Sequence, residues 1–315
     1  MNCLFIYNPV SGRGKIDKKL DRIVRSLSAR FDKVDVYRTQ CAGDMTQAVG
    51  KNAEKYDAIV FSGGDGSFNE AVQGLASARR VPLFGYIPSG TVNDVARSLG
   101  IPKSLRGALK VIRTGKSEHI DCMKVNDRLA MYICAAGIFT SVPYTTPQAQ
   151  KKMIGKLAYA VEGIRKDLFF EPFDVTVSDG TRTETTQTAF VVIVNGRYVA
   201  GMPLNGGASM TDGKIECAVI RQRKKPGFWR RIRVILSLAH LFLLGYRVKE
   251  KMITRFSGSR IEVHAEEGVR WTYDGECGDT GDITVEVLPG FVNMIVPGKF
   301  ASSVSRKRDA AKRLK

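Results

Sequence analysis

The sequence lacks the cysteine and histidine patterns that build metal sites or disulfide frameworks. Its 315 residues include six cysteines without a CxxC pair and three histidines without ligand spacing. We therefore expect reduced thiols, no zinc site and a cytoplasmic setting. The N-terminal segment MNCLFIYNP has no basic region followed by a long apolar one, so it predicts a first strand and not a signal peptide.

An apolar run long enough to cross a membrane is also missing. The run Val234 to Tyr246 covers about 13 residues, whereas a membrane-spanning helix needs about 20. Two interpretations remain: a core-packed helix with a solvated basic end, or an interfacial element. The second rests on Phe228, Trp229 and seven nearby basic residues, which are Arg221, Arg223, Lys224, Lys225, Arg230, Arg231 and Arg233.

Acidic residues are scarce relative to basic ones. There are 31 Asp and Glu against 49 Lys and Arg, which gives a net charge of +18. Such a charge favours an anionic partner, either nucleic acid or anionic lipid, although a solvated basic surface also accounts for it. No nucleic-acid-binding module is recognisable in the sequence. We expect transient contact with an anionic membrane surface and no nucleic acid.

The segment from Tyr56 to Val72 carries the strongest local signal. Ala58 to Phe61 has the length and β-branched content of a buried strand, and helical apolar spacing begins after Ser67. Glycines at 63, 64 and 66 lie between them. A strand that turns through glycines into a helix lets backbone N–H groups approach an anion, and the helix dipole adds to this attraction. The segment predicts a phosphate-binding loop.

This loop matches neither of two well-known glycine motifs. The dinucleotide fingerprint needs glycine where Asn69 stands, and the P-loop needs Gly-Lys-Ser/Thr. Asp65, inside the glycines, favours a metal-bound nucleotide, because a carboxylate that faces phosphates is repulsive unless Mg²⁺ or water intervenes. A tight turn of any α/β protein is the alternative.

Residues 1–121 predict an open α/β domain with a parallel sheet. Strand-like segments near 3–7, 34–37, 58–61 and 83–87 alternate with helical ones. The loops after parallel strands meet at one edge of the sheet, where such folds bind ligands. Asn8, Thr39, the first glycine loop and a second loop at Pro88 to Asp94 should all lie at that edge.

Residues 122–297 change character to strands. Several alternate apolar and polar residues, as do Ile283, Val285 and Val287, which predicts an antiparallel β-sandwich-like domain. Its end can pack back on the first domain. Helices are expected within it at about 152–164 and 228–244, and residues 298–315 form a basic tail. The predicted fold class is α/β plus β.

Five motifs in order resemble the soluble bacterial diacylglycerol kinase family, a lipid-kinase group related to sphingosine kinases and NAD kinase. They are NPVSGRG at 8–14, GGDGSFNE at 63–70, PSGTVNDVARSLGIP at 88–102, TDGKIE at 211–216 and YDGE at 273–276. The resemblance covers nearly the whole chain up to about Pro297. It implies an NAD kinase/diacylglycerol kinase-like fold, and transfer of the γ-phosphoryl of ATP to a lipid hydroxyl with Mg²⁺. The lipid most readily implied is diacylglycerol, giving phosphatidic acid.

The resemblance also implies roles for individual residues. Asp274 would be the general base, with Glu276 beside it in the catalytic segment. The expected magnesium positions are Asp65, Asp94, Asp121 and Asp212. The positions expected to bind ATP are Asn8, Pro9, Ser11, Gly12, Thr39, Gly63, Gly64, Asp65, Gly66, Ser67, Glu70, Gly90 and Thr91.

Two positions depart from the family pattern. Ser67 stands where threonine is usual, which keeps a hydroxyl for phosphate or metal. The family often carries two adjacent acids at a structural magnesium site. Here Thr211 occupies the first of these positions, so Asp212 is the one acid that remains.

Several alternatives remain open. Asp274-Gly275 is also an ordinary two-residue turn sequence, as at Asp179-Gly180. The enzyme alternatives are an NAD kinase-like activity or a kinase for a sphingoid base or another long-chain alcohol. A basic membrane- or nucleic-acid-binding protein without catalysis would explain the charge but not the two glycine loops. We expect a cytoplasmic enzyme that contacts the membrane peripherally and can form a homodimer.

Overall fold

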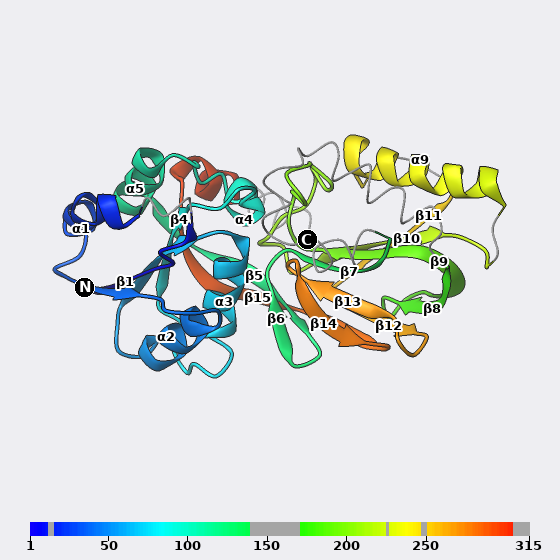
Figure 1. Cartoon of the computed structure of the whole chain (residues 1–315), viewed down its shortest axis with the longest axis horizontal. Coiled ribbons are helices and arrows are strands. Elements are labelled where there is room, and N and C mark those ends of the chain that lie inside the picture. Colours follow the sequence, from blue (N-terminus) through cyan, green and yellow to red (C-terminus); the bar gives the residue numbers. More distant parts are fainter. Residues whose placement is uncertain (12–15, 139–170, 225–226, 247–250, 305–315) are drawn as a thin grey trace, which may run out of the picture.

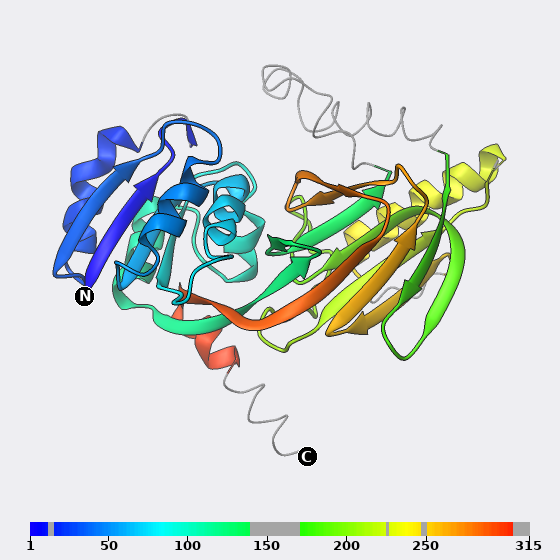
Figure 2. The ribbon, with the colours of Figure 1, turned by 90° about the horizontal axis from the view of Figure 1, so that it is seen from below.

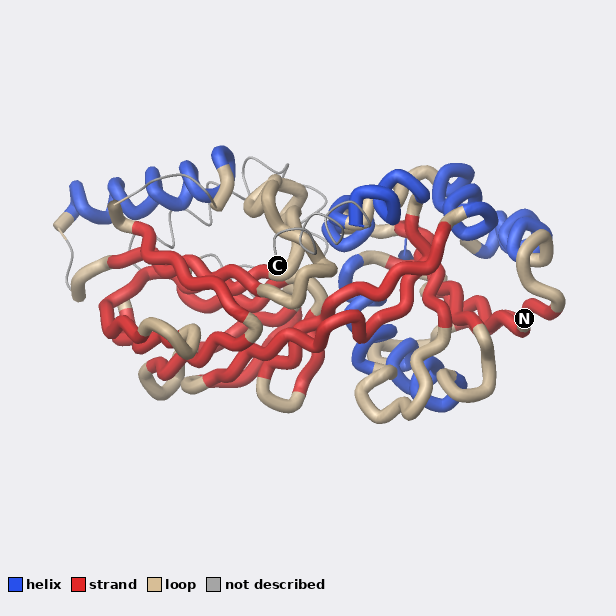
Figure 3. Tube along the Cα trace, turned by 180° about the vertical axis from the view of Figure 1, so that it is seen from behind, coloured by secondary structure: helices blue, strands red, loops and turns tan. Residues whose placement is uncertain are grey.

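The computed structural model describes residues 1–11, 16–138, 171–224, 227–246 and 251–304. Gly12, Lys225, the helix expected at about 152–164 and residues 305–315 of the basic tail lie outside the described residues. The described chain forms two lobes side by side, with helices concentrated in the first and strands in the second (Figure 1, Figure 3).

The first lobe is an open α/β layer structure. Its parallel strands have the order β2-β1-β3-β4, with bounds β1 Asn2–Tyr7, β2 Lys33–Arg38, β3 Ala58–Gly63 and β4 Leu83–Pro88. Helices α1 (Leu20–Leu27) and α5 (Leu105–Thr114) pack together on one face of the sheet. Helices α2 (Asp44–Asn52) and α3 (Asp65–Gln73) cover the other (Figure 1). A one-turn 3₁₀ helix (Asp17–Lys19) precedes α1, and the short α4 spans Asp94–Ser98.

The central strand and the helix after it confirm the sequence prediction. Residues 58–61 of β3 are buried, as are Phe68, Ala71 and Val72 on α3 and Leu75 just after it, which follow the helical apolar spacing. The helix begins at Asp65, two residues earlier than its apolar spacing indicated. Gly64 takes an extended conformation as the N-cap, and an acid in the first turn suits the helix dipole.

The second lobe is an antiparallel β-sandwich-like domain, which confirms the predicted fold class. Its strands wrap around a second core that contains Trp271 and Tyr273. The bounds are β5 Lys116–Val125, β6 Arg128–Ala130, β7 Ile133–Gly137, β8 Phe173–Ser178, β9 Thr183–Val194, β10 Ile215–Arg221, β11 Ile253–Gly258, β12 Arg260–Ala265, β13 Arg270–Tyr273, β14 Glu276–Thr280 and β15 Ile283–Val296. The predicted helix at 228–244 is α9 (Phe228–Leu244), on the outside of this lobe (Figure 1).

Two long strands, β5 and β15, join the lobes. They pair antiparallel along both lobes, with an irregularity between Leu288 and Val292 (Figure 2). The alternation of Ile283, Val285 and Val287 predicted a strand here. That strand continues through a bulge to Val296, and Gly290 supplies the left-handed φ of 62° that the bulge needs.

The end of β15 returns to the first lobe. Met294 pairs in parallel with Phe84 of β4, and residues 298–304 are helical with Ala301 and Val304 buried. The described start of the basic tail is therefore part of the first lobe's core.

Asp121 stabilises the strand bulge. One carboxylate oxygen accepts the N–H of Gly290 and the other that of Gly213, both at 2.8 Å. Asp121 is buried and the two glycines are half-buried, so its carboxylate joins the bulge of β15 to the turn before β10.

We expect Asp121→Ala to lower the free energy of unfolding by about 1 to 3 kcal/mol, because two half-buried N–H donors lose their carboxylate acceptor. Urea denaturation checks this. Asp212→Ala, which removes a nearby exposed acid, is the matched control and should change stability little. Equal midpoints for the Asp121 variant and the wild type would contradict the role.

Candidate active site

The two glycine loops touch backbone to backbone at the carboxyl ends of β3 and β4. A Cβ placed on Gly90 would lie 2.5 Å from the Cα of Gly64, which no real side chain tolerates. The Ser89 N–H also donates to the carbonyl of Gly63 at 2.8 Å. Glycine is therefore required at 90, because the loops could not otherwise approach.

Asn93 and Tyr86 hold the second loop in place. The Asn93 side chain accepts from the Gly90 N–H at 3.0 Å and donates to the Gly90 carbonyl at 2.7 Å. The Tyr86 hydroxyl donates to the Gly63 carbonyl at 3.1 Å, so one phenol joins both loops. Asn93 takes a left-handed φ of 58°, which asparagine tolerates better than most residues. Asn93 is the N-cap of α4, which begins at Asp94.

Asp65 lies at the contact between the loops. Its Oδ2 accepts the Asn93 N–H at 2.8 Å, whereas its Oδ1 is buried and accepts no hydrogen bond from any described residue. Burial raises the pKa of Asp65, although backbone hydrogen bonds partly offset this. A buried carboxylate oxygen without a partner is unusual and is the kind of atom that a bound cation or water satisfies.

Asp94 is a second buried acid beside the loops. Its Oδ1 accepts the N–H of Gly201 from the second lobe at 2.9 Å. Burial and the field of the Asp65 carboxylate raise the pKa of Asp94 to about 6. The two acids destabilise each other's ionised forms, so a cation between them would stabilise both.

The loop after β1 completes this edge of the sheet. Asn8 Oδ1 accepts the Val10 N–H at 3.0 Å, which closes a turn at Asn8-Pro9. The Ser11 hydroxyl lies 2.6 Å from that of Ser89, so the first-strand loop contacts the second glycine loop. Thr39 is buried, and its hydroxyl donates to the Tyr7 carbonyl at 3.3 Å. Thr39 thus stabilises the strand ends.

The other residues expected to bind ATP also lie at this edge. A Cβ on Gly63 would lie 2.1 Å from that of Ser67, so glycine there lets Ser67 fold over the loop. Glu70 is half-buried on α3, and Thr91 is exposed. All of the described residues predicted to bind ATP therefore lie on the strand-end loops or on α3.

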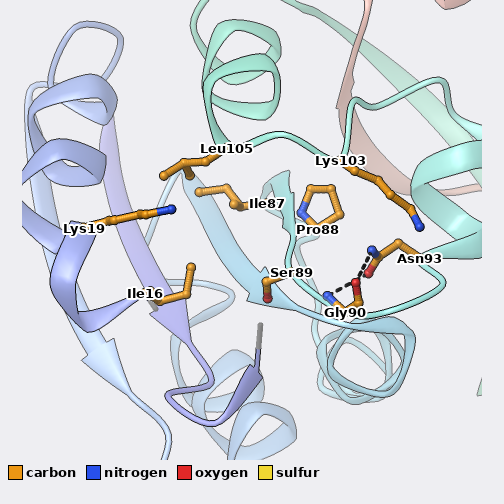
Figure 4. Close-up of a pocket in the computed structure, with 9 residues that line it drawn as sticks. All are labelled: Ile16, Lys19, Ile87, Pro88, Ser89, Gly90, Asn93, Lys103 and Leu105. Carbon is orange, nitrogen blue, oxygen red and sulfur yellow. Dashed lines mark hydrogen bonds between the residues drawn. The ribbon is translucent and has the colours of Figure 1, made fainter. Parts of the chain in front are cut away.

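A cavity of about 200 Å³ opens beside the second glycine loop (Figure 4). Ile16, Ile87 and Leu105 line it, with Pro88, Ser89, Gly90 and Asn93. Lys19 and Lys103 approach from opposite sides (Figure 4). Two cations, a hydroxyl and exposed glycine backbone suit a ligand that carries phosphate.

Asp274 is buried, with only 4% of its surface exposed. Its Oδ2 accepts from Asn69 Nδ2 at 2.9 Å and the Met131 N–H at 2.6 Å. Its Oδ1 accepts the Tyr132 N–H at 3.0 Å and the Ile133 N–H at 3.1 Å. Burial raises the pKa of Asp274, and these hydrogen bonds offset part of that rise because they stabilise the ionised carboxylate. Four donors occupy the about four lone-pair sites of a carboxylate.

One face of α3 holds the lobes together. Asn69 and Gln73 lie four residues apart and so share a face of the helix. Gln73 exchanges two hydrogen bonds with the backbone of Leu129 in β6, and Asn69 donates to Asp274. The helix that begins at Asp65 is therefore tied to the loop that surrounds Asp274.

Glu276 reaches from the second lobe toward the same helix. Its Oε1 lies 3.3 Å from the position that a Cβ on Gly66 would take. Gly66 follows Asp65 directly, so the carboxylate of Glu276 lies at the first turn of α3. Glycine at 66 leaves room for this side chain.

The predicted magnesium residues divide into two groups. Asp65 and Asp94 lie at the glycine loops. Asp121 and Asp212 instead line a separate shallow cavity beside the bulge of β15, with His119, Thr211 and Pro289. The oxygens of Asp121 bind backbone N–H groups there, which differs from the network expected around one ion with Asp65.

Sequence reasoning missed four residues that shape this site. Asn69 and Asn93 bind partners that spacing alone does not reveal, and Lys19 and Lys103 looked like ordinary surface cations. Asn93 carried one usable signal, because asparagine before a helix start is a common choice for a left-handed φ. No comparable signal marks Asn69, whose partner lies 205 residues away.

The fold and site are those of a two-domain kinase of the NAD kinase/diacylglycerol kinase type. Residues 2–125 match the diacylglycerol kinase catalytic domain, and residues 133–296 match the YegS C-terminal NAD kinase beta sandwich-like domain. The chain belongs to the diacylglycerol kinase family and is a phosphotransferase.

Similar proteins include diacylglycerol kinases of two bacteria. The chain is 32% identical to that of Bacillus subtilis (strain 168) over 294 residues, 92% of each chain. It is 29% identical to that of Staphylococcus aureus (strain bovine RF122 / ET3-1), over 87% of this chain and 85% of the relative. The solved structure of a putative diacylglycerol kinase from Bacillus anthracis str. Sterne superposes with a TM-score of 0.80 at 25% identity, over 95% of this chain and 98% of the other.

We expect Asn69→Asp to reduce turnover at neutral pH, because it sets a second carboxylate against Asp274. Part of the activity should return in mild acid, where a shared proton replaces the lost N–H. Asn69→Ala is the control and should show no such recovery, since it has no group to protonate. Parallel pH–rate profiles for the two variants would contradict a direct contact between Asn69 and Asp274.

Proposed function

We propose that this protein is an ATP- and Mg²⁺-dependent lipid kinase that phosphorylates diacylglycerol to give phosphatidic acid. Its membership of the diacylglycerol kinase family supports the reaction class. The names of its relatives support the lipid. The observation that carries the proposal is the contact between two glycine loops beside Asp65, one oxygen of which has no hydrogen-bond partner among the described residues.

We assign the nucleotide to the carboxyl edge of the parallel sheet. The glycine loops offer backbone N–H groups to phosphates, and Lys19 and Lys103 add positive charge at the neighbouring cavity. Phosphoryl transfer depends mainly on positioning and on neutralising charge, which is what loops and lysines of this kind supply.

The residues at the loops fit a magnesium ion. Mg²⁺ prefers oxygen ligands and is commonly held by one or two carboxylates together with substrate phosphates. Asp65, whose Oδ1 accepts no hydrogen bond within the described part of the chain, and Asp94 would hold it. When bound, the ion would neutralise the phosphates as charge develops on them.

We assign proton acceptance to Glu276 and a positioning role to Asp274. The family resemblance favours Asp274 as the base, but its carboxylate already accepts four hydrogen bonds and has no lone-pair site left for an incoming hydroxyl. Glu276 is exposed and lies at the first turn of α3, beside Asp65. Asp274 fixes the turn that presents it.

The direct test is phosphorylation of a lipid extract with labelled ATP, resolved by chain and head group. We expect one labelled product, phosphatidic acid. NAD and a sphingoid base serve as competing acceptors in the same assay. A labelled product from either of these, with none from diacylglycerol, would overturn the assignment.

We expect Mg²⁺ to raise the melting temperature clearly at about pH 8 and little at about pH 5, because protons compete for Asp94 below its pKa of about 6. The raised pKa means that folding keeps a proton on Asp94 that the unfolded chain has lost. The acid therefore costs stability once the pH rises through about 6, and a bound cation offsets that cost. Asp65→Asn should abolish the Mg²⁺ effect at both pH values. An equal shift at both pH values in the wild type would contradict the site.

We expect Glu276→Gln to lower kcat by about 10²- to 10⁴-fold, while the KM for ATP and the stability change little. Asp274→Asn cannot by itself identify the base. Both oxygens of Asp274 accept backbone N–H groups, so an amide would have to place its NH₂ against a donor and would destabilise the fold. Near-normal turnover in Glu276→Gln would return the role of base to Asp274.

A further inference from the structure

Helix α9 lies along the outside of the second lobe, and one of its faces packs on the sheet. Val234, Leu238 and Leu241 are buried against the strands. Figure 1 shows the helix along the outer edge of this lobe, and in Figure 2 it lies behind the strands. None of the described helices, α9 included, has the length and apolar character of a membrane span.

The opposite face of α9 is exposed and unusually apolar. Trp229 is 80% exposed, Leu236 54% and Leu244 67%. They share one side of the helix, since steps of 7 and 8 residues are close to two turns. Arg233 and His240 are exposed on the same side, between them. A stripe that alternates large apolar residues with a cation is unusual for a face meant only for water.

The charged side chains of α9 itself are all basic. No acidic residue occurs in α9. Of the basic residues predicted to form a cluster here, Arg221 pairs with Glu184, and Lys224 pairs with Asp174 and Glu266. Arg230 donates to Gln222. The exposed cations that remain to attract a partner are led by Arg223, just before the helix, and Arg233 within it.

Charge complementarity decides which occupant fits. A second copy of this chain would bring the same basic stripe against itself, and like charges repel across such a contact. An anionic lipid surface offers both an opposite charge and an apolar layer that can accept Trp and Leu side chains. Trp also favours the boundary between water and lipid.

We propose that α9 is a docking surface for an anionic lipid bilayer. Trp229, Leu236 and Leu244 enter the interface while Arg223 and Arg233 contact lipid head groups. The inference rests on the proposed function, because an enzyme that phosphorylates a lipid must reach the membrane that contains it. Binding is measured without ATP or substrate lipid, so its failure would leave the kinase proposal standing.

The chain carries a built-in reporter for this contact. It has two tryptophans, of which Trp229 is 80% exposed and Trp271 is 0% exposed. Vesicles of phosphatidylcholine and phosphatidylglycerol should shift Trp229 emission to the blue, and brominated chains should quench it while Trp271 stays unquenched. Trp229→Phe should remove the shift while vesicle co-sedimentation persists.

Matched variants separate charge at α9 from the net charge of the protein. Arg223→Gln with Arg233→Gln should weaken co-sedimentation roughly 10- to 30-fold at low salt. Lys110→Gln with Arg113→Gln, which removes two exposed cations from α5, should leave it unchanged. Leu236→Gln with Leu244→Gln should reduce both binding and quenching.

Four outcomes would overturn the proposal. They are no binding to anionic vesicles, equal binding to pure phosphatidylcholine, equal weakening by the α5 variant, or a concentration-dependent dimer that Leu236→Gln abolishes. The last would assign the surface to a second copy of the chain.

Discussion

The burial of the Asp274 carboxylate is the constraint on which the candidate site depends. A buried carboxylate is costly unless donors surround it. Three of its donors come from the backbone that follows β6, and the fourth is Asn69 on α3 of the other lobe. If the lobes separated, Asp274 would lose the hydrogen bond from Asn69 and its buried carboxylate would be left partly unsatisfied. This cost favours the arrangement in which α3 contacts the second lobe. That arrangement also sets Glu276 beside Gly66.

The four acids near the site differ in how fully their carboxylate oxygens are hydrogen-bonded. Asp121 and Asp274 have backbone or amide donors on both oxygens, which makes them structural anchors. Asp65 has one oxygen without a described partner, and Asp94 has a pKa raised to about 6 by burial and by Asp65. Charge that the protein leaves uncompensated is where a cation binds most favourably. On our proposal, this contrast, and not the number of acids, distinguishes the acids that would hold magnesium from the structural ones.

Local patterns predicted what depends on local spacing. The strand and helix around Asp65, the helix at 228–244 and the fold class followed from periodicity, glycine placement and family motifs. Contacts between distant segments could not be predicted in this way. Asn69 and Asp274 are 205 residues apart, and Asp121 finds its partners 92 and 169 residues away. The family resemblance placed Asp121 with the metal residues, but in the fold its two oxygens accept the N–H groups of Gly213 and Gly290.

The continuous sheet connects the nucleotide site to the proposed docking surface. Strands β5 and β15 run through both lobes, and β15 pairs with β4, whose end carries the second glycine loop. Strand β10, which contacts α9, pairs with β9 of the same sheet. A bilayer bound to α9 would therefore be linked to the glycine loop through paired strands and packed core residues. On our proposal, docking fixes the orientation of the phosphoryl donor relative to the lipid surface. A kinase whose acceptor cannot leave the membrane needs that orientation, since positioning is the main source of its rate.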